Sequence, residues 1–95
     1  MSPSEAAPPT RENLLAELRS LMQSEFRLKP EQIEPATHLI NDLDFDSIDL
    51  VDLAVLLEER FGFRLDNEEL NLVETVGDAV NVVHAALVRR SAGAA

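Results

Sequence analysis

The side chains with the clearest chemical potential lie in one stretch of ten residues, 41–50, with the sequence NDLDFDSIDL. Asp42, Asp44 and Asp46 occupy the first, third and fifth positions of an EF-hand calcium loop. The sixth position has serine in place of the required glycine, and the twelfth has Leu53 in place of the bidentate glutamate. We therefore expect no EF-hand site and no bound metal. An acidic protein that binds divalent cations weakly stays open as a remote alternative.

Ser47 is a second candidate, because an activated serine can act as a nucleophile. Neither of the two histidines, His38 and His84, is close to it in sequence, and the chain has neither a G-x-S-x-G elbow nor a glycine-rich phosphate loop. The chain has no cysteine, which excludes disulfides and thiolate zinc sites. We expect a protein that is not an enzyme and has no catalytic residues.

Charge narrows the possible partners. The chain has 18 acidic and 8 basic residues, for a net charge of -10, and residues 30–78 contain 14 of the acidic ones. Such a surface repels nucleic acid. No apolar run approaches the roughly 18 residues of a membrane span, and the first residues lack the features of a signal peptide. We expect a cytoplasmic protein without membrane insertion and without nucleic-acid binding.

The spacing of apolar residues predicts the elements that position these side chains. With 45% apolar residues in 95, the chain can fold as one small domain. Amphipathic helices are expected over 10–26 and 47–61, the first capped by Thr10 and the second ending at Gly62. A long connection with two prolines separates them, and its length suggests a functional role.

Two further helices complete the expected fold. A short piece is expected to be capped by Asn67 and to run through Leu72, and Thr75 with Asp78 resembles a capping box for a last helix that ends near residues 89 and 90. No strand pair is evident. The prediction is an all-α bundle of three main helices and one short helix, with one folded domain over 10–89 between disordered segments at 1–9 and 90–95.

The apolar residues of the 47–61 helix form two stripes that point in different directions. Ile48, Val51 and Val55 share one stripe, and residues 53, 57 and 61 share another that is about 200° away. Only one stripe can face a single core. We assign the core to the second stripe, which would pack against the first and last helices (Leu53, Leu57, Phe61 with Leu14, Leu18, Leu21, Val80 and Val83). The first stripe is predicted to be partly exposed, unless the long connection covers it.

The motif Asp46-Ser47-Ile48-Asp49-Leu50 resembles the acyl carrier protein family, whose modified serine lies in an Asp-Ser-Leu/Ile motif at the start of the second helix. The long connection, the LLEERF end of the second helix, the short third helix and the TVGDAV start of the last one also fall where this family has them, so the resemblance covers residues 10–89. It implies an acyl-carrier-like bundle, expected to be monomeric.

The resemblance implies that a phosphopantetheinyl transferase attaches 4'-phosphopantetheine from coenzyme A to Ser47, and that acyl groups of fatty acid, lipid or polyketide-type biosynthesis bind to its thiol. A helix N-terminus favours the resulting phosphodiester. By the same resemblance, Leu70, Leu72 and Val73 line an apolar slot for the acyl chain, and plain packing within the bundle is the alternative for these residues. The face expected to bind and steer partner enzymes comprises Asp46, Ile48, Asp49, Val51, Asp52, Val55, Glu58 and Glu59.

One departure from the family pattern bears on which carrier this is. Many fatty-acid synthase carriers have Gly-Ala before the Asp-Ser pair, whereas this chain has Asp44-Phe45. A discrete carrier that serves one specialised pathway fits this departure. A peptidyl or aminoacyl carrier of the same fold is the alternative, although such carriers tend to be less acidic along the second helix.

Overall fold

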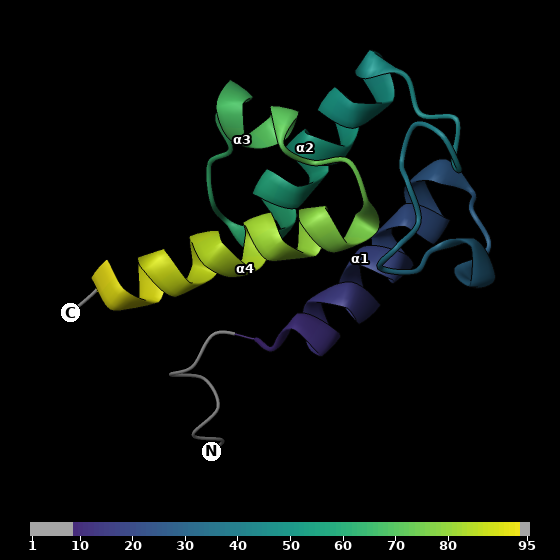
Figure 1. Ribbon diagram of the computed structural model, residues 1–95. Coiled ribbons are helices and arrows are strands. Elements are labelled where there is room, and N and C mark those ends of the chain that lie inside the picture. The colour runs from purple at the N-terminus through teal and green to yellow at the C-terminus, as the bar shows by residue number, and fades with distance from the viewer. Residues whose placement is uncertain (1–8, 94–95) are drawn as a thin grey trace.

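The computed structural model describes residues 9–93 as a bundle of helices joined by ordered connections. The elements are α1 (Arg11–Phe26), the 3-10 turn η2 (Pro30–Gln32), α2 (Ser47–Phe61), α3 (Asn67–Asn71) and α4 (Val76–Gly93). Within the described residues, the extended pairing is limited to one isolated bridge between His38 and Thr75. In Figure 1, α4 crosses the front of the molecule and the connection between α1 and α2 forms its right-hand end. The all-α prediction is confirmed.

Local capping interactions explain where α1 begins and where α2 ends. The Thr10 hydroxyl accepts a hydrogen bond from the Asn13 N–H at 3.2 Å, which satisfies one free donor at the start of α1. At the end of α2, Gly62 has φ +70° and donates its N–H to the Glu58 carbonyl at 2.8 Å. Glycine adopts this left-handed conformation without a Cβ penalty. The bounds predicted for both helices are confirmed.

The later helices differ from the prediction in their ends. Asp66, rather than Asn67, caps α3, because its carboxylate accepts the Glu69 N–H at 2.8 Å. The predicted Thr75–Asp78 capping box opens α4, with two hydrogen bonds of 3.1 Å. This helix continues to Gly93, beyond the predicted end near Arg90 and into the segment expected as a tail, because residues 91–92 (Ser-Ala) do not interrupt a helix. The disorder predicted at 1–8 and 94–95 concerns residues outside those described.

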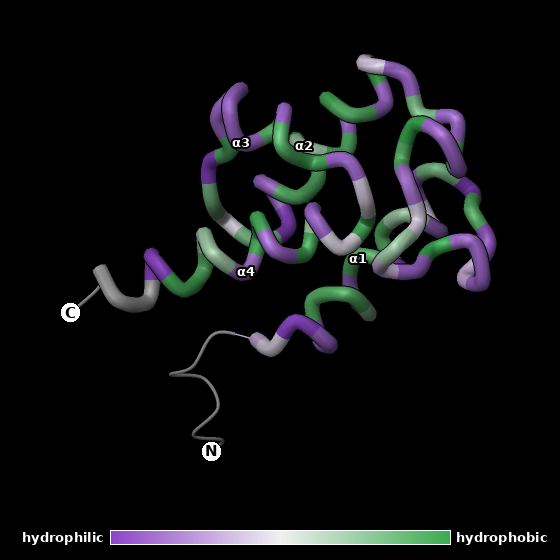
Figure 2. Tube along the Cα trace, viewed as in Figure 1, coloured by the Kyte–Doolittle hydropathy of each residue, from purple (hydrophilic) through white to green (hydrophobic). Residues whose placement is uncertain are grey.

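The core forms where α1, α2, α4 and the long connection meet. In Figure 2, hydrophobic residues recur along these helices, whereas hydrophilic residues are frequent in the connections. No polar or charged side chain is buried within the described part of the chain. Leu21 and Phe61, expected in the core, are half-buried at its edge. The fully or nearly buried residues include the other predicted ones (Leu14, Leu18, Leu53, Leu57, Val80, Val83) together with Met22, Ile33, Leu39, Phe45 and Val76.

The long connection is fixed to the start of α4 by backbone hydrogen bonds. The Leu39 N–H donates to the Glu74 carbonyl at 2.9 Å, and the Val76 N–H donates to the Thr37 carbonyl at 3.0 Å. Leu39 itself is fully buried. The segment that leads into α2 therefore has a defined position, although it contains only one short 3-10 turn. No helix within the described residues has the length and apolar character needed to cross a bilayer.

Candidate functional site

Ser47 is the first residue of α2, and its side chain is exposed. Asp46 caps the helix: its Oδ1 accepts the Asp49 N–H at 2.9 Å, and its own N–H donates to Asp49 Oδ2 at 3.2 Å. This reciprocal pair fixes the backbone on both sides of the serine. The hydroxyl of Ser47 is thus presented to solvent from a rigid position, as an attachment point requires.

The first turn of α2 is suited to an anion. The Asp49 N–H is taken by the cap, and the Leu50 N–H donates to the Asp46 carbonyl at 3.0 Å. The N–H groups of Ser47 and Ile48 precede the first intrahelical hydrogen bond and therefore have no acceptor within the helix. Together with the positive end of the helix dipole, they favour a phosphate ester on the serine oxygen.

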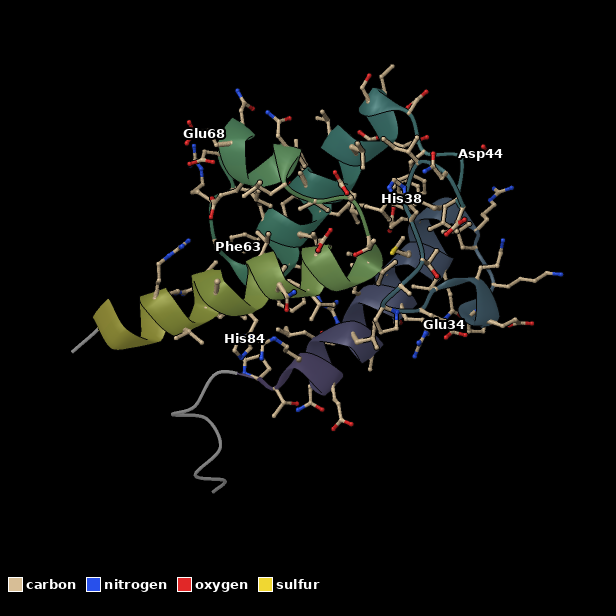
Figure 3. The ribbon with its side chains drawn as sticks, viewed as in Figure 1. Glu34, His38, Asp44, Phe63, Glu68 and His84 are labelled. Carbon is tan, nitrogen blue, oxygen red and sulfur yellow. The ribbon has the colours of Figure 1, made fainter. Side chains whose placement is uncertain are left out.

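The acidic residues before Ser47 stabilise the turn instead of converging on a cation. Asp42 Oδ2 accepts the His38 N–H at 2.8 Å, and the Asn41 N–H donates to His38 Nδ1 at 3.2 Å. His38 and Asp44 lie in this loop, as Figure 3 shows. Among the residues that the structure describes, no group of three or more possible ligands is arranged to hold a metal ion.

A hollow of about 420 Å³ lies beside Ser47, between α2, α3 and the long connection. Apolar side chains supply most of its lining, including the predicted Leu70 and Val73. The prediction for Leu72 is wrong: this side chain is 72% exposed and lines neither this hollow nor the interior behind it, because it follows α3 on the outer surface. The remaining lining residues are His38, Ile40, Leu50, Val51, Asn71 and Glu74.

A second, nearly filled space of about 10 Å³ lies behind the hollow. Leu50, Leu70 and Val73 line both spaces and therefore separate them. The inner space is bounded only by apolar side chains from α2, α4 and the segment around α3 (Leu53, Ala54, Leu57, Leu65, Ala79 and Val82 in addition to the three shared residues). A chain of methylene groups could enter it only if these side chains moved apart.

The two apolar stripes of α2 have opposite environments. Ile48 is 69% exposed, Val51 51% and Val55 43%, whereas Leu53 and Leu57 are each only 3% exposed. The long connection does not cover the first stripe, because its apolar residues Leu39 and Phe45 are directed into the core. The predicted exposure of this stripe is confirmed. An apolar strip beside an exposed serine is typical of a contact surface for other proteins.

The acidic residues expected on the partner face divide into two groups. Asp52 and Glu59 are exposed on α2. Glu58 is half-buried, and its Oε2 accepts the Leu65 N–H at 2.7 Å, which holds the connection between α2 and α3. Asp46 and Asp49 close the helix cap described above. Three of the five carboxylates therefore also stabilise the fold.

Sequence reasoning missed several residues that the fold brings to this region. His38 and Glu74 reach the hollow beside Ser47 from two different connections, and Asn71 reaches it from the end of α3. Within the described residues, no hydrogen bond joins His38 to Ser47, since His38 Nδ1 accepts the Asn41 N–H. Phe26 and Phe45 pack with their ring centroids 4.8 Å apart. These residues are separated by long stretches of sequence, so periodicity contains no signal for their proximity.

Comparison with known protein families shows which family this chain belongs to. The family described as "Phosphopantetheine attachment site" matches residues 16–83, which include Ser47, the hollow and the core of the bundle. The chain belongs to this family of carrier proteins. Several acyl carrier proteins among its relatives are matched over nearly their entire length. Acyl carrier protein 2 of Ralstonia nicotianae is 42% identical over 78 residues, which cover 82% of this chain and 96% of the relative.

Other relatives and solved structures support the same family assignment. An acyl carrier protein of Coprothermobacter proteolyticus is 38% identical over 77 residues, which cover 81% of this chain and 94% of that protein. The crystal structure of an acyl carrier protein from Thermotoga maritima matches with a TM-score of 0.75 at 26% identity and covers 84% of this chain and 93% of that one. The acyl carrier protein of Enterococcus faecalis gives a TM-score of 0.68 at 28% identity and covers 82% and 99%.

Family membership establishes what this acyl carrier does at the level of chemistry. It holds acyl groups as thioesters on covalently attached 4'-phosphopantetheine in fatty acid or related biosynthesis. The residues present fit such a group, because an exposed serine at a helix N-terminus adjoins a largely apolar hollow. Proteins of this kind are carriers of intermediates rather than catalysts, and they work with biosynthetic enzymes.

Proposed function

We propose that Ser47 is the residue to which 4'-phosphopantetheine is attached. Its place as the first residue of α2 carries the proposal, because its hydroxyl is exposed and the free N–H groups of the first turn can stabilise the phosphodiester. Ser20 and Ser24, the other serines whose side chains the structure describes, lack this combination. Ser20 and Ser24 lie within α1, where helix N–H groups are already paired.

The hollow beside Ser47 supports a role in shielding the bound group. When attached, phosphopantetheine supplies the thiol that forms the thioester. The largely apolar lining favours an acyl chain over water, because burial of each methylene contributes about 0.8 kcal/mol. Leu50, Leu70 and Val73 separate the hollow from the inner space, so their displacement would admit a longer chain.

We infer that the exposed face of α2 binds the enzymes that act on the arm, beginning with a phosphopantetheinyl transferase. The apolar stripe of Ile48, Val51 and Val55 would supply contact area, while Asp52 and Glu59 would attract basic surfaces. Asp46, Asp49 and Glu58 contribute charge to this face in addition to their roles in the fold.

The remaining proposals concern the cellular location, the oligomeric state and the pathway of the carrier. We propose that the carrier acts as a cytoplasmic monomer without catalytic activity of its own. A specialised lipid or polyketide-like pathway is favoured by Phe45, which is 5% exposed and packs against Phe26 at the position where many fatty-acid synthase carriers have alanine.

Incubation with coenzyme A and a broad-specificity transferase tests the attachment site. Intact mass spectrometry should show one added phosphopantetheine on the native chain and on Ser24→Ala, a matched control in α1, but none on Ser47→Ala. Modification of Ser47→Ala, or lack of modification of the native chain by several transferases, would exclude Ser47 as the attachment point.

A further inference from the structure

A groove of about 230 Å³ lies between the end of α1 and the middle of α2. Glu25 and Phe26, the last two residues of α1, form one side, and Asp52, Val55 and Leu56 form the other. Its volume is below the roughly 300–1,000 Å³ typical of small-molecule sites. It is therefore of a size for one long side chain and is smaller than most sites for drug-sized ligands.

The chemistry of the groove is that of an apolar floor between two carboxylates. Phe26 and Leu56 are half-buried and Val55 is 43% exposed, while Glu25 and Asp52 are exposed on α1 and α2 respectively. The last turn of α1 has no basic residue, and the nearest cation along the chain is Arg27, the C-cap that follows Phe26. This combination favours a cation with an apolar stem.

The Phe26 ring is held in place by Phe45. The two centroids are 4.8 Å apart at an interplanar angle of 39°, and Phe45 is 5% exposed. A ring packed against a buried neighbour is restrained in its motion, and a planar guanidinium can stack on such a ring, whereas an ammonium group gains less from stacking. Phe45 thus affects the surface as well as the core, because it positions Phe26, which forms one wall of the groove.

We propose that this groove binds an arginine side chain of a basic partner enzyme. The groove is continuous with the exposed α2 stripe through Val55, which belongs to both, and its two carboxylates match the charge of such a residue. The contact would extend the enzyme-binding face from α2 to α1. The inference rests on the proposed function only in taking the partner to be an enzyme that approaches Ser47.

Amide NMR titration of the full chain tests the inference. The probe is a synthetic amphipathic helical peptide with a leucine face and one central arginine, compared with the same peptide containing citrulline or lysine at that position. We expect the arginine peptide to shift the amides of Phe26, Asp52 and Val55, and the uncharged citrulline peptide to bind about three- to tenfold more weakly.

Variants of the chain assign the effect to the groove. Glu25→Gln combined with Asp52→Asn should remove the preference for arginine over citrulline, whereas Glu68→Gln, an exposed acid on α3, should retain it. Phe26→Leu should remove the preference for arginine over lysine. Phe26 also packs against Phe45, so Phe26→Leu could affect folding as well as binding. The double variant Glu25→Gln with Asp52→Asn changes only exposed side chains and therefore tests binding without affecting the core.

Equal affinity for the arginine and citrulline peptides would overturn the inference. It would also be overturned if the amide chemical shifts changed in residues 41–46 and not in the residues of the groove. The titration is performed before any prosthetic group is attached and is repeated on Ser47→Ala. A failure of Ser47 to accept phosphopantetheine would contradict the proposed function without changing this result, so the two failures are distinguishable.

Discussion

Asp44 illustrates how a single residue shapes the approach to Ser47. It has φ +60°, one of two positive values at non-glycine positions among the described residues, the other being Arg27. Aspartate tolerates this left-handed conformation better than most residues, but glycine tolerates it best. The turn therefore forms with aspartate in place of the glycine expected from the family pattern, and Phe45 follows it directly into the core.

A comparison of two variants measures the backbone strain at this turn. Asp44→Gly should be more stable than Asp44→Ala by about 1 kcal/mol, because the alanine Cβ disfavours positive φ. The measurement is the free energy of unfolding in urea. Asp44 is exposed, so neither change disturbs packing. Equal stabilities would show that the turn relaxes to negative φ.

At the scale of the helix, the two faces of α2 differ in exposure, and we expect the buried face to determine stability and the exposed face to bind partner enzymes. Leu57→Ala should lower the free energy of unfolding by about 2–5 kcal/mol, because it leaves a cavity in the core. Val51→Ala should lower it by no more than about 0.5 kcal/mol, since that side chain is 51% exposed, yet it should slow turnover with partner enzymes. A large loss of stability in Val51→Ala with normal turnover would contradict the assignment of this face.

The junction between the long connection and α4 gives a second prediction for an element. Gly77 is in the first turn of α4, where glycine to alanine would ordinarily stabilise a helix. Here a Cβ would lie 2.9 Å from the Pro35 carbonyl oxygen, which accepts the Gly77 N–H. Gly77→Ala should therefore destabilise the protein by about 1–3 kcal/mol, measured by thermal unfolding. Increased stability would indicate that the connection is not held against α4.

Helices were predictable wherever local signals determined them. Thr10, Gly62 and the Thr75–Asp78 pair set helix ends through contacts with neighbouring residues, and the structure confirms them. Asp66 was missed as a cap because the adjacent Asn67 is equally suitable by residue type. The position of Ser47 at a helix start followed from the same local logic.

The surroundings of Ser47 were less predictable, because long-range packing determines them. Leu70 and Val73 were expected at an acyl slot, but the neighbouring Leu72 turned outward. His38 reaches the hollow through backbone pairing with Thr75, a contact across 37 positions of sequence. The groove at Phe26 depends in the same way on a ring from the far end of the connection.

At the scale of the whole molecule, the main feature is the uneven distribution of charge along the chain. Of the 18 acidic residues, 14 lie in residues 30–78, whereas 6 of the 8 basic residues lie outside that range. The segment that contains α2 and α3 therefore has a net charge of -12. A field of one sign increases the rate at which basic enzymes encounter this segment more than it increases final affinity.

Salt should reveal this steering in the kinetics of the transferase. An increase in ionic strength from about 10 mM to about 0.15 M shortens the Debye length from about 30 Å to about 8 Å, so kcat/KM for modification of the carrier should fall. Asp52→Lys combined with Glu59→Lys should lower it at low salt, because both residues are exposed on α2. Asp49 is unsuitable for this test, since it closes the helix cap. If the rate responds to neither change, these acidic residues contribute to solubility and not to the encounter with enzymes.

The central claim is that acyl groups are held on an arm attached to Ser47, and peptide mapping by tandem mass spectrometry tests it most directly. The native chain would be loaded from an acyl-coenzyme A by a transferase, digested and sequenced. The account predicts acyl-phosphopantetheine on the peptide that contains Asp46-Ser47-Ile48, at Ser47, and on no other serine. The same mass on Ser20, Ser24 or any other residue, or an unmodified Ser47 in a fully loaded sample, would contradict it.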